Sequence, residues 1–344
     1  MIIDGPYAEI DAISPLFRSP APSLQCLEID SPESPGSLPD DFLGQQVLSL
    51  RCLSFSGIRL TFKSPFPLPN LTEFNLSLPQ GTGPLHMSTL LWFFSASSRL
   101  QRIRINTGHE VLHGIAPDQV ISLESLVEFD FTCKPAGRIL PYLRLPHLKQ
   151  LRVCLSLGSG QVPPKLADLL PFHGRSLITG ATEMRYSSDG RRHKVDLSGK
   201  DIYASLAVFA PGPAPIDWFS DETYVPFGQI EDLTVEGHRL AAADFPINSF
   251  KNLRTLRVIP WDLDFAEGFL LSLYPRVVIP CQSLREIWYV GPTSLCPLIR
   301  LVRERKRAGH QLESVWLLNP HKFHDDLVKE LRKYAGEVRV EERD

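Results

Sequence analysis

The chain has 344 residues, a formal net charge of -3 and 30 prolines, with 43% hydrophobic and 22% charged residues. This composition is ordinary for a soluble globular protein, and the small acidic excess gives no reason to expect nucleic acid or an anionic membrane as a partner. No apolar run is long enough to span a membrane, and the acidic residues near the N-terminus argue against a signal peptide. We therefore expect a cytoplasmic or nuclear protein.

A short phrase, Leu-x-x-Leu-x-Leu, recurs along the chain with other apolar residues sometimes replacing leucine. Its copies begin at Leu24, Leu50, Leu71, Leu100, Leu126, Leu148, Ala181, Ile230, Leu253, Leu284 and Leu312, with a possible further copy at Ala335. Successive copies start roughly 21–33 residues apart, except for one gap of roughly 49 residues after the copy at Ala181. Periods of this length indicate a solenoid, and the phrase is that of a leucine-rich repeat.

The phrase predicts a strand with one buried face, because its fourth and sixth positions are apolar and alternate with polar ones. Stacked in parallel, such strands share one core, and the connecting segments cover its other side. We predict strands at 27–29, 53–55, 103–105, 151–153 and 256–258. The fold class is then α/β: one leucine-rich-repeat domain over 1–344, an irregular right-handed horseshoe with a parallel sheet on its concave face.

Between the strands, apolar periodicity predicts a helix at 88–96. The segment 181–229 is an irregular insertion, in which Ser188-Asp189-Gly190 predicts the turn of a hairpin over 184–197. A helix at 201–209 and a proline-rich loop up to 229 should follow.

Two further helices are predicted near the C-terminus. One covers 296–308 and should turn an apolar side inward, while its basic last turns lie in solvent and Gly309 ends it. The other covers 323–334.

The six cysteines show no CxxC pair and no zinc-ligand spacing, so we expect no metal. Cys26 and Cys52 occupy the same third position of neighbouring copies. A disulfide between them is conceivable, but free thiols in a reducing compartment are the favoured interpretation.

Several stretches carry a resemblance to a known family. A turn at Leu38-Pro39-Asp40-Asp41-Phe42-Leu43, the strand LRCLSF and the run PFPLPNLTEFNLSL resemble the leucine-rich-repeat region of fungal F-box-like proteins, chiefly from mushroom-forming fungi. The resemblance covers roughly residues 20–318. It implies a substrate adaptor of a cullin-type ubiquitin ligase, in which an N-terminal F-box docks on the Skp adaptor and the repeats hold a protein substrate.

This chain departs from that pattern, because Leu38-Pro39 is followed too soon by a repeat strand to leave room for the helices of an F-box. The Skp adaptor and cullin are therefore expected as partners only if an F-box is supplied from outside this chain. The alternative is a standalone leucine-rich-repeat binding protein with no role in ubiquitin transfer.

The polar positions of the phrase should face the concave surface. Arg102 and Arg104, then Asp130, then Arg152 alternate in charge from one strand to the next. Such a row is either a ladder of internally satisfied charges or a charged recognition surface.

Two tryptophans should form the second part of a protein-binding surface. Trp288 and Trp316 share the fifth position of consecutive copies, so their rings should lie side by side, with Arg257 and Arg339 flanking them for cation–π contact. At the seventh position the apolar residues Ile259, Val290 and Leu318 should extend the patch. Exposed tryptophan and arginine together are typical of binding hot spots. Alternatively, the helix at 323–334 folds back over the rings and makes them part of the core.

No motif of a catalytic nucleophile, phosphate-binding loop or metalloprotease is present. An enzyme assembled from residues of distant repeats is conceivable, although nothing in the sequence groups an acid, a base and a nucleophile. We therefore expect a non-enzymatic scaffold that binds a protein and needs no cofactor.

Overall fold

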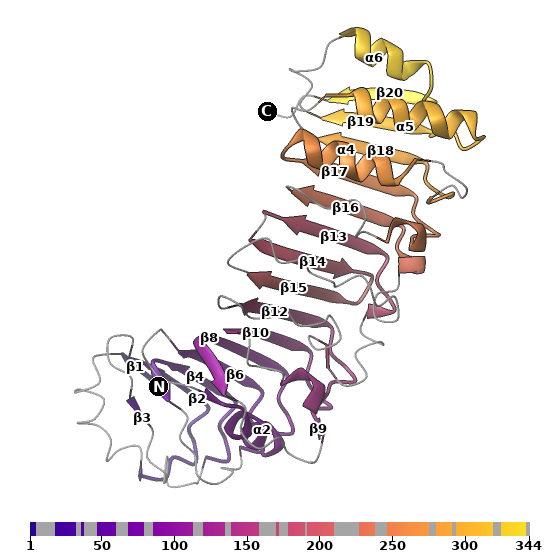
Figure 1. Cartoon of the computed structure of the whole chain (residues 1–344). Helices are drawn as coiled ribbons and strands as arrows, with labels where there is room; N and C mark the ends of the chain where they lie inside the picture. Colours follow the sequence, from indigo (N-terminus) through magenta and orange to yellow (C-terminus); the bar gives the residue numbers. More distant parts are fainter. Residues whose placement is uncertain are drawn as a thin grey trace. The chain divides into compact units, whose positions relative to one another are not determined.

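A computed structural model shows a mixed α/β protein with a large, mostly parallel sheet and few helices (Figure 1). It describes residues 1–4, 18–31, 36–37, 47–59, 68–78, 85–112, 120–134, 139–157, 170–171, 178–189, 191–209, 227–237, 246–274, 280–290, 294–318 and 325–341. The chain divides into two compact units, Met1–Leu177 and Ile178–Asp344. The prediction of a single domain stays a prediction.

The first unit is built on parallel strands in the order β1-β2-β4-β6-β8-β10-β12. Their bounds are Ile2–Asp4, Cys26–Asp30, Cys52–Ser56, Glu73–Leu78, Arg102–Leu112, Glu128–Lys134 and Gln150–Ser156. The short β7 (Leu85–His86) adds to β8, and two small parallel ladders join β3 (Gly36–Ser37) to β5 (Ile58–Arg59) and β9 (Ile121–Ser122) to β11 (Leu143–Arg144).

The second unit has the strand order β15-β14-β13-β16-β17-β18-β19-β20. The strands are β13 (Glu183–Ser188), β14 (Arg192–Ser198), β15 (Tyr203–Phe209), β16 (Asp232–Gly237), β17 (Thr255–Pro260), β18 (Glu286–Val290), β19 (Ser314–Leu318) and β20 (Glu337–Glu341). From β13 through β16 to β20 the pairing is parallel, whereas β13, β14 and β15 pair antiparallel.

The repeated phrase sets the register, because equivalent positions lie opposite each other on neighbouring strands. Leu27 pairs with Leu53 in the first unit, and Leu256 pairs with Ile287 in the second, so the apolar fourth positions line up in a buried row within each unit. The five predicted strand segments all lie within observed strands, and the possible last copy forms β20. The prediction of an α/β protein with a parallel sheet is confirmed in its coarser form, since the large sheet is mostly parallel.

The backbone hydrogen bonds repeat with the phrase. The N–H groups of Arg51 and Cys52 both donate to the carbonyl of Gln25, at 2.7 and 3.0 Å. The same pair of bonds recurs between most consecutive copies, for example from Arg254 and Thr255 to Glu231. At the last strand the two bonds go to different acceptors, since Gly336 donates to Leu312 and Glu337 donates to Glu313. One acceptor position therefore fixes the alignment of most consecutive strands.

Among the described residues, the helices are α2 (Met87–Ser95), α4 (Leu263–Ser272), α5 (Cys296–Arg307) and α6 (Asp325–Arg332), and 3₁₀ turns lie at Leu140–Tyr142, Phe227–Gln229 and Ile247–Ser249. The predictions of helices at 88–96 and 296–308 are confirmed, and Gly309 follows α5 with a φ of 82°. Figure 1 shows α4 and α5 along one face of the sheet, and α6 packs against α5 and β20. No helix in the described ranges is long and apolar enough to cross a membrane.

The hairpin over 184–197 is confirmed as β13 and β14, but the helix predicted at 201–209 is wrong, because Tyr203–Phe209 forms strand β15. Leu206 pairs with Val195, and Ala204 pairs with Leu197, so the segment extends the hairpin as a third antiparallel strand. A short apolar run that is buried on both faces carries no periodicity that separates a strand from a helix.

Some predicted features lie outside the described residues. These are the turn at Leu38-Pro39, most of the proline-rich loop of the insertion, and the first residues of the helix predicted at 323–334.

Candidate protein-binding surface

The register of β17 to β20 builds a stack of four side chains, Arg257, Trp288, Trp316 and Arg339, which we call the tryptophan stack. Each member lies directly opposite the next on the neighbouring strand. The two indole rings have their centroids 4.4 Å apart and an interplanar angle of 3°. The predicted side-by-side placement of the rings is therefore what the structure shows.

An arginine covers the outer face of each ring. The guanidinium carbon of Arg257 lies 5.4 Å from the ring centroid of Trp288, and that of Arg339 lies 4.4 Å from the centroid of Trp316. Both distances fall within the range of cation–π attraction. Arg339 is held in addition by Glu337, whose carboxylate lies 2.8 Å from its Nε. This hydrogen bond lowers the pKa of Glu337 and raises that of Arg339.

Both faces of each indole are therefore occupied within the protein. Both rings are only partly exposed, and their Nε1 atoms are buried without a hydrogen-bond partner among the described residues. A partner can meet this surface only at the edges of the rings and through the free N–H groups of the arginines. The stack is a rigid polar-aromatic ridge rather than an aromatic cage for a cation.

The apolar extension at the seventh position is smaller than expected. Ile259 and Val290 are half-buried on the same face as the rings. Leu318 is only 3% exposed, so its assignment to the exposed patch is wrong. It lies between Val290 and Glu341 on the neighbouring strands, which flank it on both sides.

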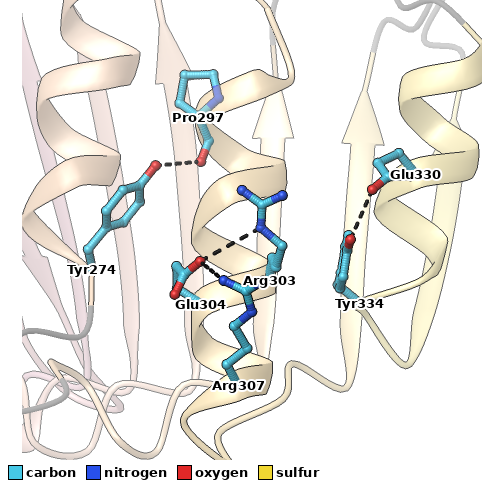
Figure 2. A network of polar contacts seen from close by, with 7 residues as sticks. All are labelled: Tyr274, Pro297, Arg303, Glu304, Arg307, Glu330 and Tyr334. Atoms are coloured by element: carbon cyan, nitrogen blue, oxygen red, sulfur yellow. Dashed lines mark hydrogen bonds and ion pairs between the residues drawn. The ribbon is translucent and has the colours of Figure 1, made fainter.

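The last helix packs against α5 and β20, and Figure 2 shows the polar contacts around α4, α5 and α6. Tyr334, which follows α6, lies under the guanidinium of Arg303 from α5 at 6.0 Å and donates to Glu330 at 2.9 Å. Tyr274, just after α4, donates to the carbonyl of Pro297 at 3.2 Å. The helices are thus tied to one another, and α6 does not lie over the tryptophan rings.

The sequence predicted that the basic last turns of α5 lie in solvent, but one of their side chains is buried. Arg305 is fully buried and donates to the carbonyls of Pro280 and Cys281, at 2.8 and 3.0 Å. Burial lowers the pKa of Arg305 and raises that of the Cys281 thiol to about 12. The charge of Arg305 and of its basic neighbours predicted exposure. Helical spacing was the signal for its burial, because it places Arg305 on the same side of α5 as the buried Leu298 and Leu301.

In the first unit the alternating charges are neighbours, as predicted. Arg102 forms an ion pair with Glu73 at 2.6 Å, and Arg104 approaches Glu128 at 3.8 Å. Asp130 lies opposite both Arg104 and Arg152 in the register. Burial raises the pKa of Asp130, while the two arginines act in the other direction.

These charges neutralise one another only in part, because both ion pairs are partly exposed and solvent weakens their attraction. We call Glu73, Arg102, Arg104, Glu128, Asp130 and Arg152 the charged ladder. Whether it also meets a partner stays a prediction.

Cys26 and Cys52 lie directly opposite each other on β2 and β4, and both are free thiols in the structure. Burial, followed by the hydrogen bond of the Cys52 thiol with Cys26, raises the pKa of Cys52 to about 11. Among the described residues, no group of three histidine, cysteine or acidic side chains is arranged to hold a metal ion.

Comparison with known proteins places the chain in no family. No family model matches the sequence, and no curated protein matches it either.

Proposed function

We propose that this chain is a leucine-rich-repeat solenoid that acts as a non-catalytic scaffold and binds a protein partner with the uncovered face of its sheet. The observation that carries the proposal is the in-register placement of the repeated phrase on consecutive parallel strands. Such stacking projects the polar positions of every copy from one face, and solenoids use surfaces of this kind for binding.

The tryptophan stack supports a protein as the ligand. Tryptophan and arginine are enriched among the residues that dominate the energy of protein interfaces. The stack is held by contacts on both ring faces, so little side-chain entropy is lost when a partner docks against it.

The resemblance to F-box-like proteins supports a more specific version, in which the bound protein is a substrate of a cullin-type ubiquitin ligase. Strands β2 and β4 pair directly, so only the short connection between Asp30 and Cys52 separates them in the chain. A docking module of about forty residues would not fit there. Contact with the Skp adaptor would then need an F-box from outside this chain.

Affinity capture from a native extract, with quantitative mass spectrometry, tests the proposal. The purified chain is compared with a Trp288→Ala/Trp316→Ala variant and with an Arg307→Ala variant, whose exposed side chain lies on α5. We expect a protein that is enriched by the wild type and the Arg307 variant and lost with the tryptophan variant. Equal capture by all three would contradict the proposed surface.

The ubiquitin-related version has a separate test. The purified chain alone should not bind a purified Skp adaptor. Recovery of Skp and cullin together with the captured protein supports the adaptor role, while a partner without them supports a standalone binding protein.

A further inference from the structure

A polar groove runs along the first unit, where the strands of the sheet begin. It has a volume of about 730 Å³. The described residues that line it are Gln25, Leu48, Ser49, Arg51, Asn70, Thr72, Arg99, Gln101 and Ser125. The lining therefore contains two guanidinium groups, several neutral hydrogen-bonding groups and, among these residues, no carboxylate.

The structure fixes one of the two arginines without neutralising its charge. Arg99 donates from Nη1 to the side-chain oxygen of Asn70 at 2.8 Å, and Asn70 donates in turn to the carbonyl of Leu48 at 2.6 Å. An amide partner orients a guanidinium but leaves its positive charge uncompensated. The remaining N–H groups of Arg99 are directed by a fixed neighbour and stay free for a ligand.

In the second unit, arginines at the second position of the phrase form ion pairs with acidic residues at the same position of neighbouring copies. There Arg254 pairs with Glu231 at 3.6 Å, and Arg285 pairs with Glu313 at 3.1 Å. These four residues hold the second position of their copies, which Gln25, Arg51 and Thr72 hold in the first unit. The backbone N–H of Arg51 donates to Gln25 as that of Arg254 donates to Glu231, so an uncharged residue stands beside Arg51 where an acid stands beside Arg254.

No other described carboxylate takes its place. Glu73, which follows Thr72, is engaged by Arg102 at 2.6 Å. Glu124, which precedes Ser125, accepts a hydrogen bond from Ser122. In the part of the chain that the structure describes, neither Arg51 nor Arg99 forms an ion pair.

We propose that this groove binds an acidic, extended segment of the protein partner, with Arg51 and Arg99 as the carboxylate-binding residues. An acidic segment presupposes the protein-binding role proposed above and gives it a chemical class of ligand. The groove crosses the starts of five consecutive strands, a distance of about 19 Å at the usual strand spacing, which an extended segment of about six residues would span.

The lining also argues for a segment rather than a single small anion. Leu48 is 65% exposed at one part of the groove and offers an apolar contact beside the arginines. The side chains of Gln25, Gln101 and Ser49 can hydrogen-bond the peptide groups between the acidic residues. Carboxylates that reach both arginines would form charge-assisted hydrogen bonds, which are the strongest available here.

The test uses the full chain and a fluorescein-labelled hexaglutamate peptide, followed by fluorescence anisotropy at low ionic strength. Hexaglutamine and hexalysine with the same label serve as ligand controls. We expect hexaglutamate to bind, with an affinity that falls as salt is added, and the two controls not to bind.

Matched variants then locate the site. Arg51→Ala/Arg99→Ala should weaken binding of hexaglutamate by about tenfold or more, whereas Arg254→Ala/Arg285→Ala should change it by less than about twofold. Gln25→Glu places an acid beside Arg51, as in the ion pairs of the second unit, and should also weaken binding of hexaglutamate while the fold stays intact. All of these side chains lie at the surface, so circular dichroism of the variants should match the wild type.

Three outcomes would overturn the assignment: no binding of hexaglutamate, equal losses in the two double variants, or full competition by inorganic phosphate at the concentration of peptide carboxylate. The first two remove the groove as a specific site, and the third makes it a site for small anions. The tryptophan variants test the protein-binding role separately. A partner that is lost with those variants but retained by Arg51→Ala/Arg99→Ala refutes the groove and leaves the proposed function standing.

Discussion

At the scale of single residues, the tryptophan stack gives a prediction about binding. Trp288→Ala and Trp316→Ala should each weaken partner binding by about 2 kcal/mol or more, because each removes a large aromatic side chain from the proposed binding surface. Folding stability should also fall, by the burial lost at a half-buried ring plus about 0.5–1.5 kcal/mol for the stacking contact. Calorimetry of binding and urea unfolding of each variant measure the two quantities.

A double-mutant cycle checks that the two rings act as one unit. The coupling free energy between them should be favourable by about 0.5 kcal/mol or more in the unfolding measurements. Stacked indoles also couple their electronic transitions, so the circular dichroism bands of the pair should vanish in either single variant. Additive effects together with unchanged bands would contradict the stacked geometry.

Arg305 gives a second prediction, about stability. Arg305→Met would leave the buried carbonyls of Pro280 and Cys281 without donors, and it should lower the free energy of unfolding by about 3 kcal/mol or more. Arg307 is the matched control, because it lies two residues further along α5 and pairs with Glu304 at the surface. Arg307→Met should cost under about 1 kcal/mol in the same urea titration.

The buried thiol of Cys281 makes stability depend on pH in the alkaline range. Its pKa is raised to about 12 in the folded protein, from an ordinary value of 9.0. The folded state therefore favours the neutral thiol, and the stability that this thiol contributes is complete below pH 9 and is lost as the pH rises toward 12.

At pH 10 the loss should be on the order of 1 kcal/mol relative to neutral pH. Cys281→Ser keeps a donor for the carbonyl of Ile247 but does not titrate. Urea unfolding from pH 8 to 10 should thus show a shallower decline for the variant than for the wild type. Parallel curves would mean that the thiol does not carry the effect.

At the scale of elements, the close contact between β13 and β16 depends on one glycine. Gly237 ends β16 with a φ of 138°, and a Cβ placed on it would lie 1.9 Å from the carbonyl oxygen of Ser188. Gly237→Ala should therefore destabilise the protein by about 2 kcal/mol or more, because both the φ angle and the space exclude a side chain.

Gly228 is the control for that change, since a Cβ there would meet no atom within 4 Å. Gly228→Ala should leave the melting temperature nearly unchanged. If both variants melt alike, the close pairing of the two strands at Ser188 is not what constrains Gly237.

The sequence predicted the elements that carry a clear period. The strand within 151–153 and the helix within 296–308 follow alternation and helical spacing, and both formed. Tyr203–Phe209 could not be assigned in this way, because a strand buried on both faces has no alternation to detect. Its antiparallel pairing with β14 depends on a partner that local sequence does not reveal.

The same limit applies to the candidate site. The order of Arg257, Trp288, Trp316 and Arg339 follows from counting positions within the phrase. Leu318 and Arg305 were both predicted to be exposed, and both are buried. Their burial depends on neighbours from other strands and loops, which the position and polarity of one residue do not reveal.

At the scale of the whole molecule, a solenoid should transmit damage only to adjacent repeats. Leu256 is fully buried in β17, and Leu256→Ala should cost about 2–5 kcal/mol in a well-packed core. Because each repeat contacts chiefly its neighbours, hydrogen exchange should accelerate in β16, β17 and β18 and remain close to the wild type in β2 and β4. Exchange that rises uniformly along the chain would contradict the proposed solenoid.

The shared acceptor of the backbone has a consequence for how such a gene can change. Between most consecutive copies, one second-position carbonyl meets the same two N–H groups, so these repeats present their successors with the same attachment point. Unequal recombination that removes or duplicates one whole repeat would rejoin the sheet without a mismatch in the main chain. Side chains such as Gln25 and Glu231 would then be free to diverge between copies, and ligand choice could evolve separately from repeat number.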